Sequence, residues 1–189
     1  MAIYFEGWIL YSYIILCIVL AVFLKRFYKK SFVYLFFFSI MAVYIFNVIK
    51  LTQFPIYIDE YQREAFGGQN VWREMNLIPF KYDFTMASFL NIVMTLPFGF
   101  GLPFLIKTSF KRIFIAAILI GLIMEVCQLL SALYAGYTFR YVDINDVIFN
   151  FMGTIIGYII FKVFKMSISI LINKLKIQSN ALIKYIQNT

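Results

Sequence analysis

The sequence predicts an all-α integral membrane protein, a bundle of about five transmembrane helices followed by a C-terminal interfacial amphipathic helix. Hydrophobic residues make up 63% of the 189 positions and charged residues only 14%, whereas soluble domains carry roughly 25% charged residues. The apolar residues are gathered in blocks, and a helix needs about 20 residues to cross roughly 30 Å of hydrocarbon. These observations exclude a water-soluble fold.

The apolar blocks predict one transmembrane domain, residues 1–166, with a long outer loop at 50–84. The apolar part of the last block, 147–161, covers only about 22 Å as a helix. It crosses the membrane if Lys162 and Lys165 extend their amines to the headgroups. We expect the five spans at about residues 7–24, 31–49, 85–106, 113–135 and 147–164.

The basic residues predict the orientation of the bundle. Four of them, Lys25, Arg26, Lys29 and Lys30, fill the first turn between spans, and the positive-inside rule puts that turn in the cytoplasm. The N-terminus is then outside and the C-terminus cytoplasmic. On this topology the cytoplasmic segments hold 12 of the 17 basic residues and none of the 9 acidic residues.

Residues 167–189 form the predicted amphipathic tail. Apolar residues recur there at helical spacing with lysines between them, which is typical of a helix lying on the anionic inner leaflet. A binding helix for a cytoplasmic partner would show the same pattern. Membrane orientation also explains the net charge of +8, so no nucleic acid partner is expected.

The chain contains no histidine, which excludes Ser-His and Cys-His nucleophilic pairs, histidine bases and histidine-ligated zinc. Any catalysis must use carboxylates, amides, Lys, Arg, Tyr or a hard metal ion. We expect no cofactor. Clustered carboxylates suit a divalent cation such as Mg²⁺, but Arg140 lies so close to them in sequence that a metal is disfavoured.

Glu125 is the single charged residue within the fourth span, and an ionisable side chain near the bilayer midplane costs a few kcal/mol. Gln128 is three residues on and shares its helical face. A protonated Glu125 could tie two helices together. Alternatively, it serves as a proton-transfer group or substrate ligand at the floor of a cavity open to the outside.

A polar stripe follows where the fourth span ends and the fifth begins. Asp143, Asp146 and Asn150 fall on one helical face, just after Arg140. Capping of a helix start is an alternative role for the two aspartates, but it does not explain Asn150, a turn deeper. Gly153 and Gly157 continue the stripe as a small-xxx-small pair that permits close helix packing.

The third span contains two prolines and two glycines within residues 97–103, shortly after Asn91. An ordinary kinked helix and a broken span whose backbone lines a binding site both fit this pattern. Before it, the segment Asn76-Leu-Ile-Pro-Phe80 marks the return of the outer loop to the membrane.

Taken in order, four motifs resemble the VanZ-like family and cover roughly residues 70–160. They are Asn76-Leu-Ile-Pro-Phe80, Asn91 with the stretch 97–103, Glu125-x-x-Gln128, and Arg140-x-x-Asp143-x-x-Asp146-x-x-x-Asn150-x-x-Gly153. The resemblance implies a protein of the bacterial cytoplasmic membrane related to one that gives low-level resistance to teicoplanin, a glycopeptide with a fatty acyl tail. It implies no established reaction.

The leading hypothesis is an outward-facing polar cavity that binds or modifies a lipid-linked or acylated cell-envelope molecule and contributes to teicoplanin tolerance. Membrane lipids and that molecule are the expected partners. The predicted catalytic residues are Glu125, Asp143 and Asp146, and the predicted substrate-binding residues are Arg140, Gln128, Asn150, Asn91 and Asn76. A non-enzymatic protein that sequesters or shields against a lipophilic antibiotic is the alternative, and a proton-coupled transporter ranks third. The sequence leaves oligomeric state and enzymatic activity open.

Overall fold

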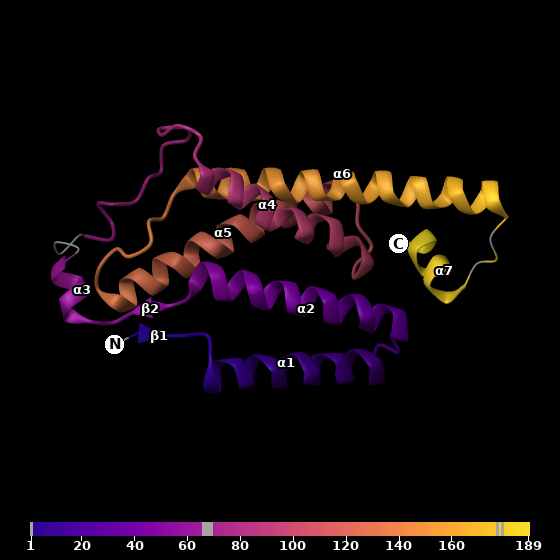
Figure 1. Ribbon diagram of the computed structural model, residues 1–189, viewed down its shortest axis with the longest axis horizontal. Helices are drawn as coiled ribbons and strands as arrows, with labels where there is room; N and C mark the ends of the chain where they lie inside the picture. The colour runs from indigo at the N-terminus through magenta and orange to yellow at the C-terminus, as the bar shows by residue number, and fades with distance from the viewer. Residues whose placement is uncertain (1, 66–69, 177, 179) are drawn as a thin grey trace.

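Five long helices run side by side along the longest axis of the molecule (Figure 1). The structure is a computed structural model that describes residues 2–65, 70–176, 178 and 180–189. The five helices are long and apolar enough to cross a membrane, so the predicted all-α membrane fold is confirmed. They are α1 (Gly7–Arg26), α2 (Phe32–Gln53), α4 (Met86–Gly101) with the 3-10 turn η1 (Leu102–Phe104), α5 (Phe110–Ala135) and α6 (Ile144–Leu175).

Smaller elements lie at the two ends of the bundle. β1 (Ala2–Ile3) pairs antiparallel with β2 (Ile56–Tyr57), which follows α2. The short helix α3 (Glu60–Ala65) lies in the long connection between α2 and α4, the expected outer loop, of which residues 66–69 are outside the described part. The C-terminal helix α7 (Ala181–Asn188) lies at the other end of the bundle, away from α3, where the chain turns back after α6 (Figure 1).

Hydroxyl and carboxylate side chains begin the helices. The Oγ of Ser31 accepts a hydrogen bond from the backbone N–H of Tyr34, and the Oγ of Ser109 accepts one from that of Arg112. Such N-caps satisfy donors that the first helical turn leaves unpaired. The third span is not broken at Pro97, because a proline removes only one helical donor. α4 continues through it to Gly101, and η1 then tightens the chain.

Glycines allow α4 and α6 to pack with their backbones in contact. A Cβ added at Gly153 would lie 2.1 Å from the carbonyl oxygen of Ile92, and one at Gly157 would lie 2.0 Å from that of Leu96. No side chain fits in that space. The predicted packing role of Gly153 and Gly157 is therefore confirmed.

Replacing Gly157 by alanine is expected to lower the free energy of unfolding by about 1–3 kcal/mol, because the added methyl forces two packed backbones apart. In an ordinary helix, replacing glycine by alanine raises stability by about 1 kcal/mol. A loss of stability in this variant would therefore reflect the forced separation of the two backbones and not helix propensity. Thermal unfolding of the purified protein in detergent measures it. Gly101→Ala is the control, since its Cβ would meet only the flexible end of Met41; equal stability of both variants would contradict the prediction.

The fifth span is longer than expected. α6 runs to Leu175 rather than to about residue 164, because nothing interrupts the helix before Lys176 adopts a left-handed conformation with φ 49°. Residues 167–175, the first part of the predicted tail, prolong α6. The rest of the tail includes residues 177 and 179, which lie outside the described residues.

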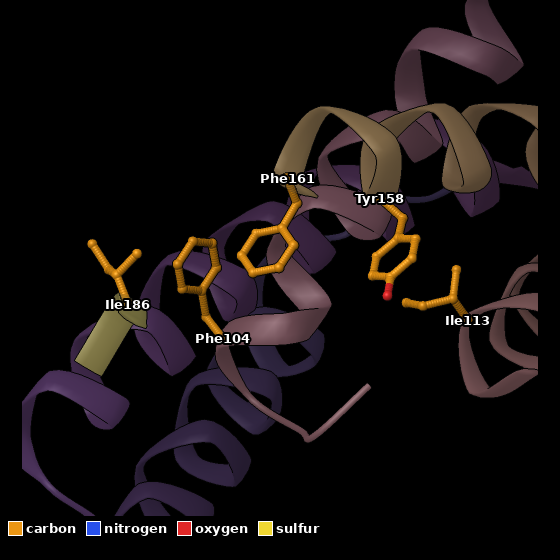
Figure 2. Packing of buried hydrophobic residues seen from close by; sticks show 5 residues of the cluster. All are labelled: Phe104, Ile113, Tyr158, Phe161 and Ile186. Atoms are coloured by element: carbon orange, nitrogen blue, oxygen red, sulfur yellow. The ribbon is translucent and has the colours of Figure 1, made fainter. Parts of the chain in front are cut away.

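α7 closes one end of the bundle. Its Ile186 is buried at one end of an apolar cluster, beside Phe104 of η1, and the cluster continues through Phe161 and Tyr158 of α6 to Ile113 of α5 (Figure 2). The hydroxyl of Tyr185 donates to the backbone oxygen of Phe104. The amphipathic character predicted for the tail is therefore used to cover the apolar end of the helices.

Candidate functional site

The connection between α5 and α6 sets the position of Glu125. α5 continues beyond Glu125 to Ala135, and the chain then returns so that the backbone N–H of Asp143 donates to Oε2 of Glu125 at 2.9 Å. Figure 1 shows α5 reaching further than the start of α6 at the end of the molecule that carries α3. Glu125 therefore lies level with the start of α6.

Asn76 links the outer loop to this same point. Its backbone N–H donates to the oxygen of Val142 at 2.9 Å, and its own oxygen accepts from the N–H of Ile144 at 2.9 Å. Its side-chain Nδ2 donates to Oδ1 of Asp143 at 2.8 Å. Asn76, Asp143 and Glu125 thus form one hydrogen-bonded chain across three segments.

Asp143 also caps α6, which is the alternative role weighed for it. Its Oδ1 accepts from the backbone N–H of Asn145 at 2.8 Å. The side chain of Asn145, 6% exposed, in turn accepts from the N–H of Phe80 at 2.6 Å. Sequence analysis missed Asn145 because it lies off the helical face shared by Asp143 and Asp146, although it stands between them in the same motif.

A cavity of about 690 Å³ opens between α2 and α4 and reaches α5 and the start of α6. Four of the predicted site residues line it: Asn91, Gln128, Arg140 and Asp146. Asn91 and Asp146 lie near each other on this wall. Much of the remaining wall is apolar, including Val48, Leu51, Leu90, Val93 and Met94.

α2 supplies cavity residues that sequence analysis did not identify. Tyr44, Asn47 and Thr52 all line the cavity. The hydroxyl of Tyr44 donates to the backbone oxygen of Met94 in α4 at 2.8 Å, which joins the two helices. Polar side chains in an otherwise apolar span were the available signal.

Arg140 is a half-buried cation with unused hydrogen-bonding capacity. Its Nη2 donates to the backbone oxygen of Phe54 at 2.9 Å, at the end of α2. Its Nε is buried without a hydrogen-bond partner. Among the described residues no carboxylate lies within salt-bridge distance of it. Burial lowers the pKa of the guanidinium, but Arg remains protonated in proteins.

Glu125 and Asn150 lie outside the cavity wall. Glu125 is 5% exposed and its Oε1 has no hydrogen-bond partner. Asn150 is 1% exposed within the α4–α6 interface, where its backbone oxygen accepts from the hydroxyl of Thr95 at 2.8 Å. Its side-chain Oδ1 is buried and unpaired. Asn150, the member of the predicted polar stripe furthest along α6, thus lies between α4 and α6.

The predicted site residues therefore fall into three groups. Asn91, Gln128, Arg140 and Asp146 line the cavity, whereas Asn76, Asp143 and Glu125 form the adjoining hydrogen-bonded chain. Asn150 alone is enclosed by α4 and α6. Across residues 2–65, 70–176, 178 and 180–189, no three His, Cys, Asp or Glu side chains are arranged to hold a metal ion.

Comparison with known proteins assigns the family. The model of the VanZ/LLP1 family matches residues 41–165, a stretch that runs from α2 into α6 and contains every residue that lines the cavity. No curated protein and no solved structure matches the chain. Because the family model covers well over half of the sequence, this multi-pass membrane protein belongs to the VanZ/LLP1 family.

Proposed function

We propose that the cavity between α2 and α4 binds a lipid-linked or acylated molecule of the cell envelope, or modifies it, and so contributes to tolerance of teicoplanin. Membership of a family linked to antibiotic resistance supports this role. The observation that carries the proposal is the combination of an apolar wall with the half-buried Arg140, which forms no salt bridge with any described carboxylate. An amphiphile with an acidic headgroup complements both features.

The side chains of the cavity divide into separate tasks. Arg140 binds the acidic group through its free N–H donors, since charge-assisted bonds are the strongest available to it. Asp146, which lines the same cavity near Asn91, accepts a hydrogen bond from the headgroup. Glu125 would transfer a proton from its position next to the cavity wall, where the backbone N–H of Asp143 fixes its Oε2 by a hydrogen bond.

An outward-facing cavity is part of the proposal. The positive-inside rule supports it, because Lys25 and Arg26 end α1 and Lys107 precedes α5 at the opposite end of the bundle from Arg140. The molecule bound would then belong to the outer leaflet of the bacterial cytoplasmic membrane.

The main alternative is binding without chemistry, by which the protein sequesters the acyl tail or shields the membrane. Glu125 favours it, because one of its oxygens is engaged by the backbone of Asp143 and the other is buried away from the cavity. Asp146 is the sole carboxylate among the described residues that line the cavity.

Mass spectrometry separates binding from modification. Envelope lipids and added teicoplanin are to be analysed from cells with and without the protein, with an Arg140→Ala variant as control. A new mass that depends on Arg140 is expected if the protein is an enzyme. Recovery of every molecule unchanged, with tolerance intact, supports sequestration.

A further inference from the structure

We propose that the cavity continues into a groove along α2 and α4 that holds one acyl chain of a phosphodiester lipid, with its headgroup at Arg140. The inference rests on the proposed function and names the substrate class of that site. A second hollow of about 200 Å³ lies between the same two helices, and Tyr44 and Pro97 line both. The polar cavity and the apolar hollow therefore adjoin.

The groove has the length of a lipid chain. From Asn91 in the first hollow to Phe104 in the second, the chain rises about 20 Å at helical pitch. One leaflet contributes half of the hydrocarbon thickness, or about 15 Å. An acyl chain anchored by its headgroup near Arg140 would thus extend to Phe104, where the aromatic rings of Phe37 and Tyr185 stack at the end of the groove.

The packing of α4 explains why this seam stays open. On one side α4 contacts α6 through glycines, backbone against backbone. On the other side it meets α2 through side chains: at Gly101 the nearest atom is the terminal carbon of Met41. Leu90 and Val93 remain 56% and 44% exposed along the seam. A lipid can therefore enter from the side of the bundle, without passing through water.

The charges of the cavity select the headgroup. The described residues that line it include one cation, Arg140, and one acid, Asp146. Arg140 balances the single negative charge of a phosphodiester. Asp146 accepts from a hydroxyl or ammonium group and repels a second negative charge. Phosphodiester lipids that carry such a donor fit better than phosphomonoesters, diphosphates or uncharged diacylglycerols.

Native mass spectrometry of the purified full-length chain tests this with four defined probes. Phosphatidylglycerol and phosphatidylethanolamine carry the donor, phosphatidylcholine lacks it, and diacylglycerol lacks the phosphate. We expect the first two to be retained most strongly. Val93→Trp, which narrows the groove at its cavity end, and Arg140→Gln should each weaken that retention about tenfold or more. Ile123→Trp, on the exposed face of α5, is the matched control and should leave it unchanged.

Equal retention by the Val93→Trp and Ile123→Trp variants, or equal retention of all four probes, would overturn the groove. Leu90→Trp repeats the test at a second position in case Val93→Trp lowers the yield. The tolerance assay separates this inference from the proposed function. Loss of tolerance on Arg140→Ala, with tolerance and lipid retention both kept on Val93→Trp, overturns the groove alone. Full tolerance without Arg140 overturns the proposed function, and groove-dependent retention would still stand.

Discussion

Replacing Arg140 by alanine is expected to abolish the contribution of the protein to teicoplanin tolerance while the protein still accumulates in the membrane. The change removes the sole cation of the described cavity wall. Hydrogen bonds to charged groups contribute about 1.5–3 kcal/mol each, which corresponds to roughly a ten- to hundredfold loss of affinity for an acidic headgroup. The measurement is the inhibitory concentration of teicoplanin at matched protein levels.

The structural cost of this change is small enough for the test to be clean. Removing the guanidinium breaks one well-formed hydrogen bond, the one to the backbone oxygen of Phe54. That oxygen lies at the end of α2 and not inside the bundle. Arg73→Ala is the control, because Arg73 is an exposed arginine in the connection between α2 and α4 and does not line the cavity. Unchanged tolerance in the Arg140→Ala variant would remove the basis of the site.

Replacing Glu125 by glutamine is expected to abolish tolerance without unfolding the protein, if the site performs chemistry. The amide oxygen of glutamine still accepts from the backbone N–H of Asp143, so the link between α5 and α6 is preserved. What is lost is the ability to take up and release a proton. Tolerance and thermal stability, measured on the same preparations, separate these two contributions.

Glu125→Ala provides the contrast. It leaves the N–H of Asp143 without an acceptor at a buried position, which should cost about 1–3 kcal/mol of stability. A glutamine variant that keeps full tolerance beside an unstable alanine variant would show that Glu125 only joins two helices. The protein would then act by binding alone.

Features that depend on nearby residues were predictable from the sequence. Hydropathy over about 20 residues gave the five spans, and the spacing of Gly153 and Gly157 gave the closest helix contact. The end of the helix α6 was not predictable in this way, because hydropathy alone does not set the residue at which a helix stops. The helix stops instead where Lys176 takes a left-handed conformation.

The arrangement of the site depends on contacts between distant residues. Asn76 and Asp143 are 67 positions apart, and nothing in either segment specifies that their backbones pair. The level of Glu125 follows from the return of the chain after Ala135, which is a property of the connection rather than of the helix. The contribution of α2 to the cavity arises in the same way, since it depends on which helix faces α4.

The contact of α7 with the far end of the bundle limits how the cavity can be used. Ile186 lies beside the ring of Phe104, which packs in turn against Phe161 (Figure 2). An acyl chain that enters between α2 and α4 would therefore meet aromatic rings at Phe104, held in place by α6 and α7. An aromatic end of this kind suits the receptor or lipid-tailoring enzyme proposed above.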